Sequence, residues 1–175
     1  MDKRLTRLQV AGFVWTSLAG TLLHFLYDIS GKNELVALFS AVNESIWEHM
    51  KLFFFPTVLF ALMQNHFLGS EYKNFWCVKL IGTLLGLATI PIAYYTYTGI
   101  FGINVDWVNI TIFFVAALVA YFAETRMFRK GNIPCNPIIA IIILWLVAVM
   151  FLVFTYTPPH ILLFEDPVTK TYGIN

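Results

Sequence analysis

Five long apolar stretches dominate this chain of 175 residues and restrict what it can fold into. A helix needs roughly 17–25 apolar residues to cross the core of a bilayer, and each stretch meets that length. The stretches lie near residues 9–27, 52–68, 76–97, 107–125 and 137–157. Only short loops and a tail over residues 158–175 remain, so the sequence predicts one all-α transmembrane bundle without a soluble domain.

The composition agrees with a lipid environment. Hydrophobic residues make up 59% of the chain and charged residues 12%, about half the charged share of a soluble domain. The net charge of +1 and the lack of a basic cluster with interleaved aromatics argue against a nucleic-acid partner. Leu8 to Tyr27 is long for a signal-peptide core and no A-x-A pattern follows, so it is predicted to stay as the first span.

Lysine and arginine are unevenly distributed between the predicted loops. Six of them flank the first and fourth stretches: Lys3, Arg4, Arg7, Arg126, Arg129 and Lys130. Because cytoplasmic loops are enriched in these residues, the N-terminus is predicted in the cytoplasm and, after five crossings of the plasma membrane, the C-terminus outside. Most acidic residues and three of the four histidines then lie at the outer face.

The run NESIWEHMK over residues 43–51 sets polar side chains directly beside the second apolar stretch. An ionisable side chain at a membrane boundary must be solvated, paired or bound to a ligand, which makes this run the default candidate site. Its candidates are Asn43, Glu44, Ser45, Glu48, His49 and Lys51. Leu35 to Val42 is apolar but too short to cross, so we expect a short interfacial or re-entrant helix there. One long helix over residues 34–68 is the alternative.

The predicted topology adds His24 and Asp28 from the first span, and His160 and Asp166 from the tail, to the same outer face. Imidazole nitrogens and carboxylate oxygens are ligands of zinc, manganese and iron. The candidate ligands of a divalent metal are His24, Glu44, Glu48, His49 and His160. Neither HExxH nor a pair of ExxH motifs occurs, so this prediction depends on shared location.

Two other interpretations of these residues stay open. In the first, they form a hydrogen-bonded network that orders the outer loops, with Glu48 paired to Lys51 and His24 to Asp28. In the second, Ser45 is a nucleophile with His49 as its base one helical turn away, although Ser45 fits a helix-start residue better. Catalytic candidates in an enzyme would be Glu48 and His49 as acid–base groups and Lys51 as the partner of an anionic headgroup.

Other residues carry packing signals. Gly82 and Gly86 are four residues apart in the third stretch, a spacing that admits close helix contacts and could equally serve a homo-oligomer. Cys77 and Cys135 begin the third and fifth stretches at the predicted cytoplasmic end. Thiols in that compartment stay reduced and the CxxC spacing is missing, so no disulfide is expected.

The motifs NESIWEHMK and PPHILLFEDPVTKTYG, together with His24-Phe25-Leu26-Tyr27, resemble an uncharacterised family of small bacterial multi-spanning membrane proteins. That family has an NES-x-WEH-x-K block after an HFLY segment and ends in PPH-x-x-LF-x-DP. The match runs through the chain in order. What the resemblance implies is the fold and the membrane location, with no activity, substrate or cofactor attached.

Three functions fit these observations. The first is a metal-dependent hydrolase or transferase that acts on a lipid or lipid-linked substrate at the outer face. The second is a small transporter or substrate-binding membrane subunit for an ion, proton or metabolite. The third is an accessory or sensor protein without catalysis. The concentration of polar groups at one face favours the enzyme slightly over the transporter.

Overall fold

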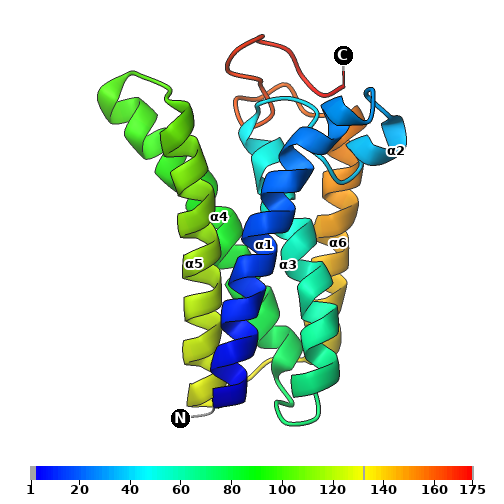
Figure 1. The fold of residues 1–175 in the computed structure, drawn as a ribbon, viewed down its shortest axis with the longest axis vertical. Coiled ribbons are helices and arrows are strands. Elements are labelled where there is room, and N and C mark those ends of the chain that lie inside the picture. The colour runs from blue at the N-terminus through cyan, green and yellow to red at the C-terminus, as the bar shows by residue number, and fades with distance from the viewer. Residues whose placement is uncertain (1–2, 132, 175) are drawn as a thin grey trace.

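The computed structural model describes residues 3–131 and 133–174, which form six helices (Figure 1). Their bounds are α1 Lys3–Ile29, α2 Glu34–Ala37, α3 Ile46–Leu68, α4 Phe75–Phe101, α5 Asp106–Lys130 and α6 Pro137–Tyr156. All except α2 are long and apolar enough to cross a membrane. The predicted all-α bundle of five spans, with a short helix before the second, is confirmed. The alternative of one long helix over residues 34–68 is not formed.

The five long helices run up and down, so α1 begins at one end of the bundle and the tail after α6 lies at the other (Figure 1). We call the first the disulfide end, because it holds Cys77 and Cys135. We call the second the tail end; it holds the connection between α1 and α3 and residues 157–174. In Figure 1, α4 and α5 turn away from the other helices at the tail end.

Capping residues and one serine shape the connection between α1 and α3. The side chain of Asn33 accepts hydrogen bonds from the first amides of α2, and Ser45 caps α3 in the same way. The hydroxyl of Ser40 accepts a hydrogen bond from the amide of Tyr27 and donates one to the carbonyl of Leu23. These contacts hold the connection against the last turns of α1 and bring residue 44 next to residue 24.

Small residues allow close packing in the centre of the bundle. Gly86 of α4 lies against the ring of Phe53, and Gly20 of α1 lies against the ring of Phe113. Ala116 and Ala120 of α5 are fully buried, and α4 and α5 form the most extensive helix pair. A side chain at either glycine would displace a buried ring, which explains the need for small residues at these helix crossings.

The outward faces of the helices are apolar as well. α6 has a mean hydropathy of 3.1 over its most apolar part, the highest of the five long helices. Its exposed side chains include Ile138, Ile142, Trp145 and Leu146. A continuous exposed surface of this kind fits contact with lipid tails rather than water.

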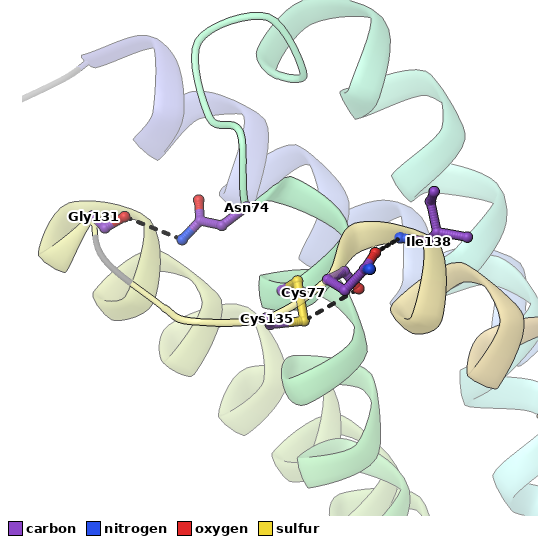
Figure 2. Close-up of a disulfide and its surroundings, with 6 residues drawn as sticks. Asn74, Cys77, Gly131, Cys135 and Ile138 are labelled. Atoms are coloured by element: carbon purple, nitrogen blue, oxygen red, sulfur yellow. Dashed lines mark hydrogen bonds between the residues drawn. A yellow bond between two sulfur atoms is a disulfide. The ribbon is translucent and has the colours of Figure 1, made fainter.

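Cys77 and Cys135 form a disulfide, so the prediction that both thiols are free is wrong (Figure 2). Cys77 lies in the first turn of α4, and Cys135 lies just before α6, with their Cα atoms 6.0 Å apart. The two cysteines are 58 residues apart in sequence. Only the packing of α4 against α6, which the cysteine spacing cannot reveal, brings them together.

Candidate functional site

Three side chains that can bind metal ions converge at the tail end: His24, Glu44 and His49. One ligand atom of each lies within 4.8 Å of the others. Nε2 of His24 lies 3.7 Å from one carboxylate oxygen of Glu44, and Nε2 of His49 lies 3.5 Å from the other. The carboxylate of Glu44 therefore lies between two imidazoles, whose ring centroids are 5.5 Å apart.

The hydrogen bond of His49 determines which of its ring nitrogens is free. Nδ1 lies 2.9 Å from the carbonyl oxygen of Ser45. Because a carbonyl only accepts, Nδ1 donates, and in the neutral ring Nε2 keeps a lone pair that faces Glu44. A lone pair and a carboxylate at this distance repel unless a proton or a metal ion lies between them. Metal-bound histidines usually donate their other N–H to a carbonyl or carboxylate in this way.

The side chain of Ser45 has the contacts of a helix cap. Its hydroxyl accepts a hydrogen bond from the amide of Glu48 at 3.4 Å, and its own amide donates to Oδ1 of Asn43 at 2.9 Å. The residue is buried. These contacts favour the capping role over a nucleophile, and they set the start of α3 so that His49 follows one turn later.

Asp166 connects the tail to Glu44. One carboxylate oxygen accepts hydrogen bonds from the amides of Val168 and Thr169, and the other accepts from the amide of Glu44 at 3.3 Å. Burial raises the pKa of Asp166, but these backbone hydrogen bonds outweigh burial and hold its pKa below the usual range. Asp166 is therefore an ionised residue that positions Glu44 rather than a member of the metal-binding group.

A cavity of about 390 Å³ adjoins the three candidate ligands. Its walls come from α1, the start of α3, the tail-end part of α5 and the tail itself. Most of the wall is apolar, with Phe25, Phe113 and Phe114 among its residues, and its other polar groups include Asn109 and Asp106. No lysine or arginine of the described chain lines it. The cavity thus offers carboxylates and imidazoles to a cation, and apolar surface to a hydrocarbon chain.

Glu48 and Lys51 lie outside this cavity and form an ion pair inside the bundle. Both side chains are buried. Nζ of Lys51 also donates to the carbonyl of Ala37 at 2.8 Å and to the hydroxyl of Thr155 at 2.9 Å. Glu48 accepts from the amide of Val42 at 3.1 Å. The pair expected in the network interpretation is present, and it ties α2, α3 and α6 together.

The remaining predicted site residues lie elsewhere at the tail end. The ring of His160 stacks on Tyr172 with centroids 4.5 Å apart, and it is not in the group formed by His24, Glu44 and His49. Asn43 donates to the carbonyl of Gly173 at 3.0 Å, a second connection between the tail and α3. Asp28 is exposed on the last turn of α1, and the partner of His24 is Glu44 instead.

Sequence reasoning missed a second ion pair, between Lys79 of α4 and Glu124 of α5. Nζ of Lys79 lies 2.7 Å from Oε2 of Glu124 and donates to Oε1 of Gln64 at 2.9 Å. All three side chains are buried. The signal was present, because both charges lie within predicted apolar stretches, where an ionisable residue is costly without a partner.

Comparison with known proteins assigns the chain to a family whose function is not known. A model described as a family of unknown function, DUF6512, matches residues 4–174. No curated protein and no solved structure matches the chain. The match spans all five long helices and the tail, so it covers the candidate site as a whole. The chain therefore belongs to DUF6512, a family of unknown function.

Proposed function

We propose that this membrane protein is a metal-dependent hydrolase or transferase that acts on a lipid or lipid-linked substrate. The observation that carries the proposal is the convergence of His24, Glu44 and His49 within 4.8 Å at the wall of an apolar cavity. The positive-inside distribution of Lys and Arg supports an orientation in which this cavity opens at the outer face of the plasma membrane.

The donor set fits zinc or a similar divalent ion. Two imidazole nitrogens and one carboxylate oxygen are the ligands of one kind of catalytic zinc site, in which the fourth position is left for water or substrate. An iron(II) ion also accepts two histidines and a carboxylate. Nε2 of His49 has its lone pair directed at the group, and Glu44 supplies negative charge between the rings. A bound ion of this kind activates water and polarises a carbonyl or phosphoryl oxygen.

The shape and charge of the cavity support an amphiphilic substrate. The rings of Phe25, Phe113 and Phe114 offer surface to an acyl or isoprenoid chain, and Asn104 and Asn109 offer amide groups to a polar head. Lys51 was expected to hold an anionic headgroup, but its ammonium group is engaged with Glu48, Ala37 and Thr155. An anionic group in this cavity would therefore be bound through the metal ion.

Purified protein is expected to contain about one zinc or iron per chain, and His49→Ala or Glu44→Ala is expected to lower this at least tenfold. Each variant removes one of the three proposed ligands, whereas the fold keeps its core contacts. Elemental analysis of detergent-purified protein measures the change. His160→Ala is the matched control, since this imidazole stacks on Tyr172 and should leave the metal content unchanged. Wild-type protein that holds no metal after loading and dialysis would contradict the proposal.

Asp166→Ala is expected to weaken metal binding by about 10–100-fold without removing a ligand. The variant loses the acceptor that holds the amide of Glu44, and it frees the turn at Val168 beside the cavity. Chelator competition measures the affinity, and Asp28→Ala is the control because this carboxylate is exposed at the same end. Equal affinities in both variants and wild type would mean that the tail does not position Glu44.

The ionisation of Asp166 also determines how the tail responds to acid. The pKa of Asp166 is depressed in the folded protein, so its contribution to stability is fully present above the ordinary carboxyl pKa of about 3.9. It is lost as the pH falls through the depressed value. Limited proteolysis within residues 158–174 should therefore increase only below about pH 4 in wild type. In Asp166→Ala the tail should be cleaved at neutral pH as well.

A further inference from the structure

The two buried lysine–glutamate pairs differ in how completely their carboxylates are satisfied. Oε2 of Glu48 accepts from Lys51 and from the amide of Val42, and Oε1 lies 3.3 Å from the hydroxyl of Thr155. Oε2 of Glu48 therefore has two donors, and Oε1 faces a hydroxyl that it shares with the carbonyl of Phe151. Oε2 of Glu124 accepts from Lys79, but Oε1 is buried without a hydrogen-bond partner among the described residues. A buried ionised carboxylate with one bare oxygen is costly.

The residue next to that bare oxygen is also unsatisfied. The side chain of Gln9 of α1 is 3% exposed and lies close enough to Glu124 to interact with its carboxylate, but outside the geometry of a formed hydrogen bond in the described structure. An amide presents either an N–H or an oxygen, depending on its rotation by 180°. With a small shift of its side chain, Gln9 can therefore donate to an ionised Glu124 or accept from a protonated one.

We propose that Glu124 is an internal proton-binding site of the bundle. The proton binds at Oε1 and is donated to Oε1 of Gln9, while Oε2 keeps its hydrogen bond from Lys79. Uptake changes the net charge of the pair from zero to +1, because Lys79 remains an ammonium group. Glu48, whose Oε2 has two donors and whose Oε1 faces the hydroxyl of Thr155, is a static structural partner by contrast.

The surroundings of Glu124 favour a proton over a metal cation as the occupant. Nζ of Lys79 already lies 2.7 Å from Oε2, and a divalent ion would bring twice the positive charge of a proton to the same pair. The other elements packed around the pair contribute Gln9 from α1, Gln64 from α3 and Tyr121 from α5. Of these only Tyr121 titrates, and its ring centroid lies 4.9 Å from Nζ of Lys79. A proton adds no ionic radius and meets an acceptor that is already in place.

Three hydroxyl groups lie on the tail side of this pair, in the centre of the bundle. The hydroxyl of Tyr121 lies 2.9 Å from that of Thr16, which lies 3.3 Å from that of Thr57. Each hydroxyl can donate and accept, so these three groups can exchange a proton with one another. Toward the disulfide end the site is closed by a cluster of apolar side chains: Leu5, Leu68, Phe75, Val78 and Phe128. The hydroxyl groups near the pair therefore lie on its tail side, and apolar side chains lie on the other.

Infrared spectroscopy of the purified full-length protein across a pH series tests the proposal. Wild type is expected to show a buried protonated carboxyl band whose intensity grows as the pH falls. The band should be lost in Glu124→Gln and kept in Glu48→Gln, the matched control at the second buried pair. No titrating buried carboxyl in wild type, or the same band in Glu124→Gln, would overturn the proposal.

A second measurement needs no variant, in case Glu124→Gln does not fold. An apolar carbodiimide reacts with protonated carboxyl groups within a membrane, and peptide mass spectrometry locates the modification. We expect Glu124 of wild type to be modified at acidic pH, at least tenfold less at alkaline pH, and Glu48 at neither. Modification of Glu124 that does not depend on pH, or no modification at all, would overturn the proposal.

Discussion

Replacing Lys51 by methionine is expected to destabilise the folded protein by about 3–5 kcal/mol, the usual cost of leaving a buried charge without its partner. Glu48 would keep the amide of Val42 and its contact with the hydroxyl of Thr155 but lose the ammonium group with which it pairs. The variant would also release the carbonyl of Ala37 and thereby the contact between α3 and α2. Unfolding by a denaturing detergent, followed by circular dichroism, measures the change.

The double variant Lys51→Met with Glu48→Leu distinguishes the stability lost through an unpaired buried charge from the stability lost through altered packing. Replacing both members of a buried ion pair by apolar residues is often neutral, so most of the lost stability should return. Its metal content should equal that of wild type, because neither residue lines the cavity. If Glu48→Gln alone lost the metal while the fold persisted, Glu48 would be a ligand, as the sequence analysis allowed, and the assignment of the centre to His24, Glu44 and His49 would be wrong.

The fold could be predicted from the sequence because it depends on length and hydropathy. A segment such as residues 107–125 has few ways to satisfy its backbone in lipid other than a helix that crosses it. The short helix before the second span was predictable for a similar reason, since Leu35 to Val42 cannot cross. Asn33 and Ser45 then supply the caps that separate α2 from α3.

The candidate site could be predicted only in part, because topology gathers residues at one face without choosing partners. His24, Glu44 and His49 do converge. Their convergence depends on the way Ser40 holds the connection against α1, which no spacing rule contains. Glu44 precedes the cap Ser45 and lies outside α3, so its spacing of four from Glu48 does not place the two on one helix face, and Glu48 pairs with Lys51 away from the cavity. The ring of His160 lies on Tyr172 because the tail folds back on itself, with Glu165 bridged to Tyr172.

Loss of the disulfide is expected to destabilise the protein by about 2–4 kcal/mol. The bond closes a loop with a sequence separation of 58 and fixes the start of α6 to the first turn of α4. Cys135→Ser is the preferred variant because residue 135 is exposed, whereas a serine at the buried position 77 would add an unsatisfied hydroxyl. Detergent unfolding of wild type with and without a thiol reductant should reproduce the difference. Equal stabilities would mean that the packing of α4 against α6 alone holds this end.

The disulfide and the distribution of Lys and Arg support opposite orientations of the protein in the membrane. Lys and Arg at the disulfide end favour the cytoplasm, whereas a disulfide that persists favours an oxidising compartment. With the orientation proposed above, a membrane-impermeant maleimide should label Cys135 after reduction in inverted vesicles and not in intact cells. Without reduction neither cysteine should react, because both sulfurs are bonded to each other. Labelling in intact cells after reduction would place the disulfide end outside, and the cavity beside His24, Glu44 and His49 would then open toward the cytoplasm.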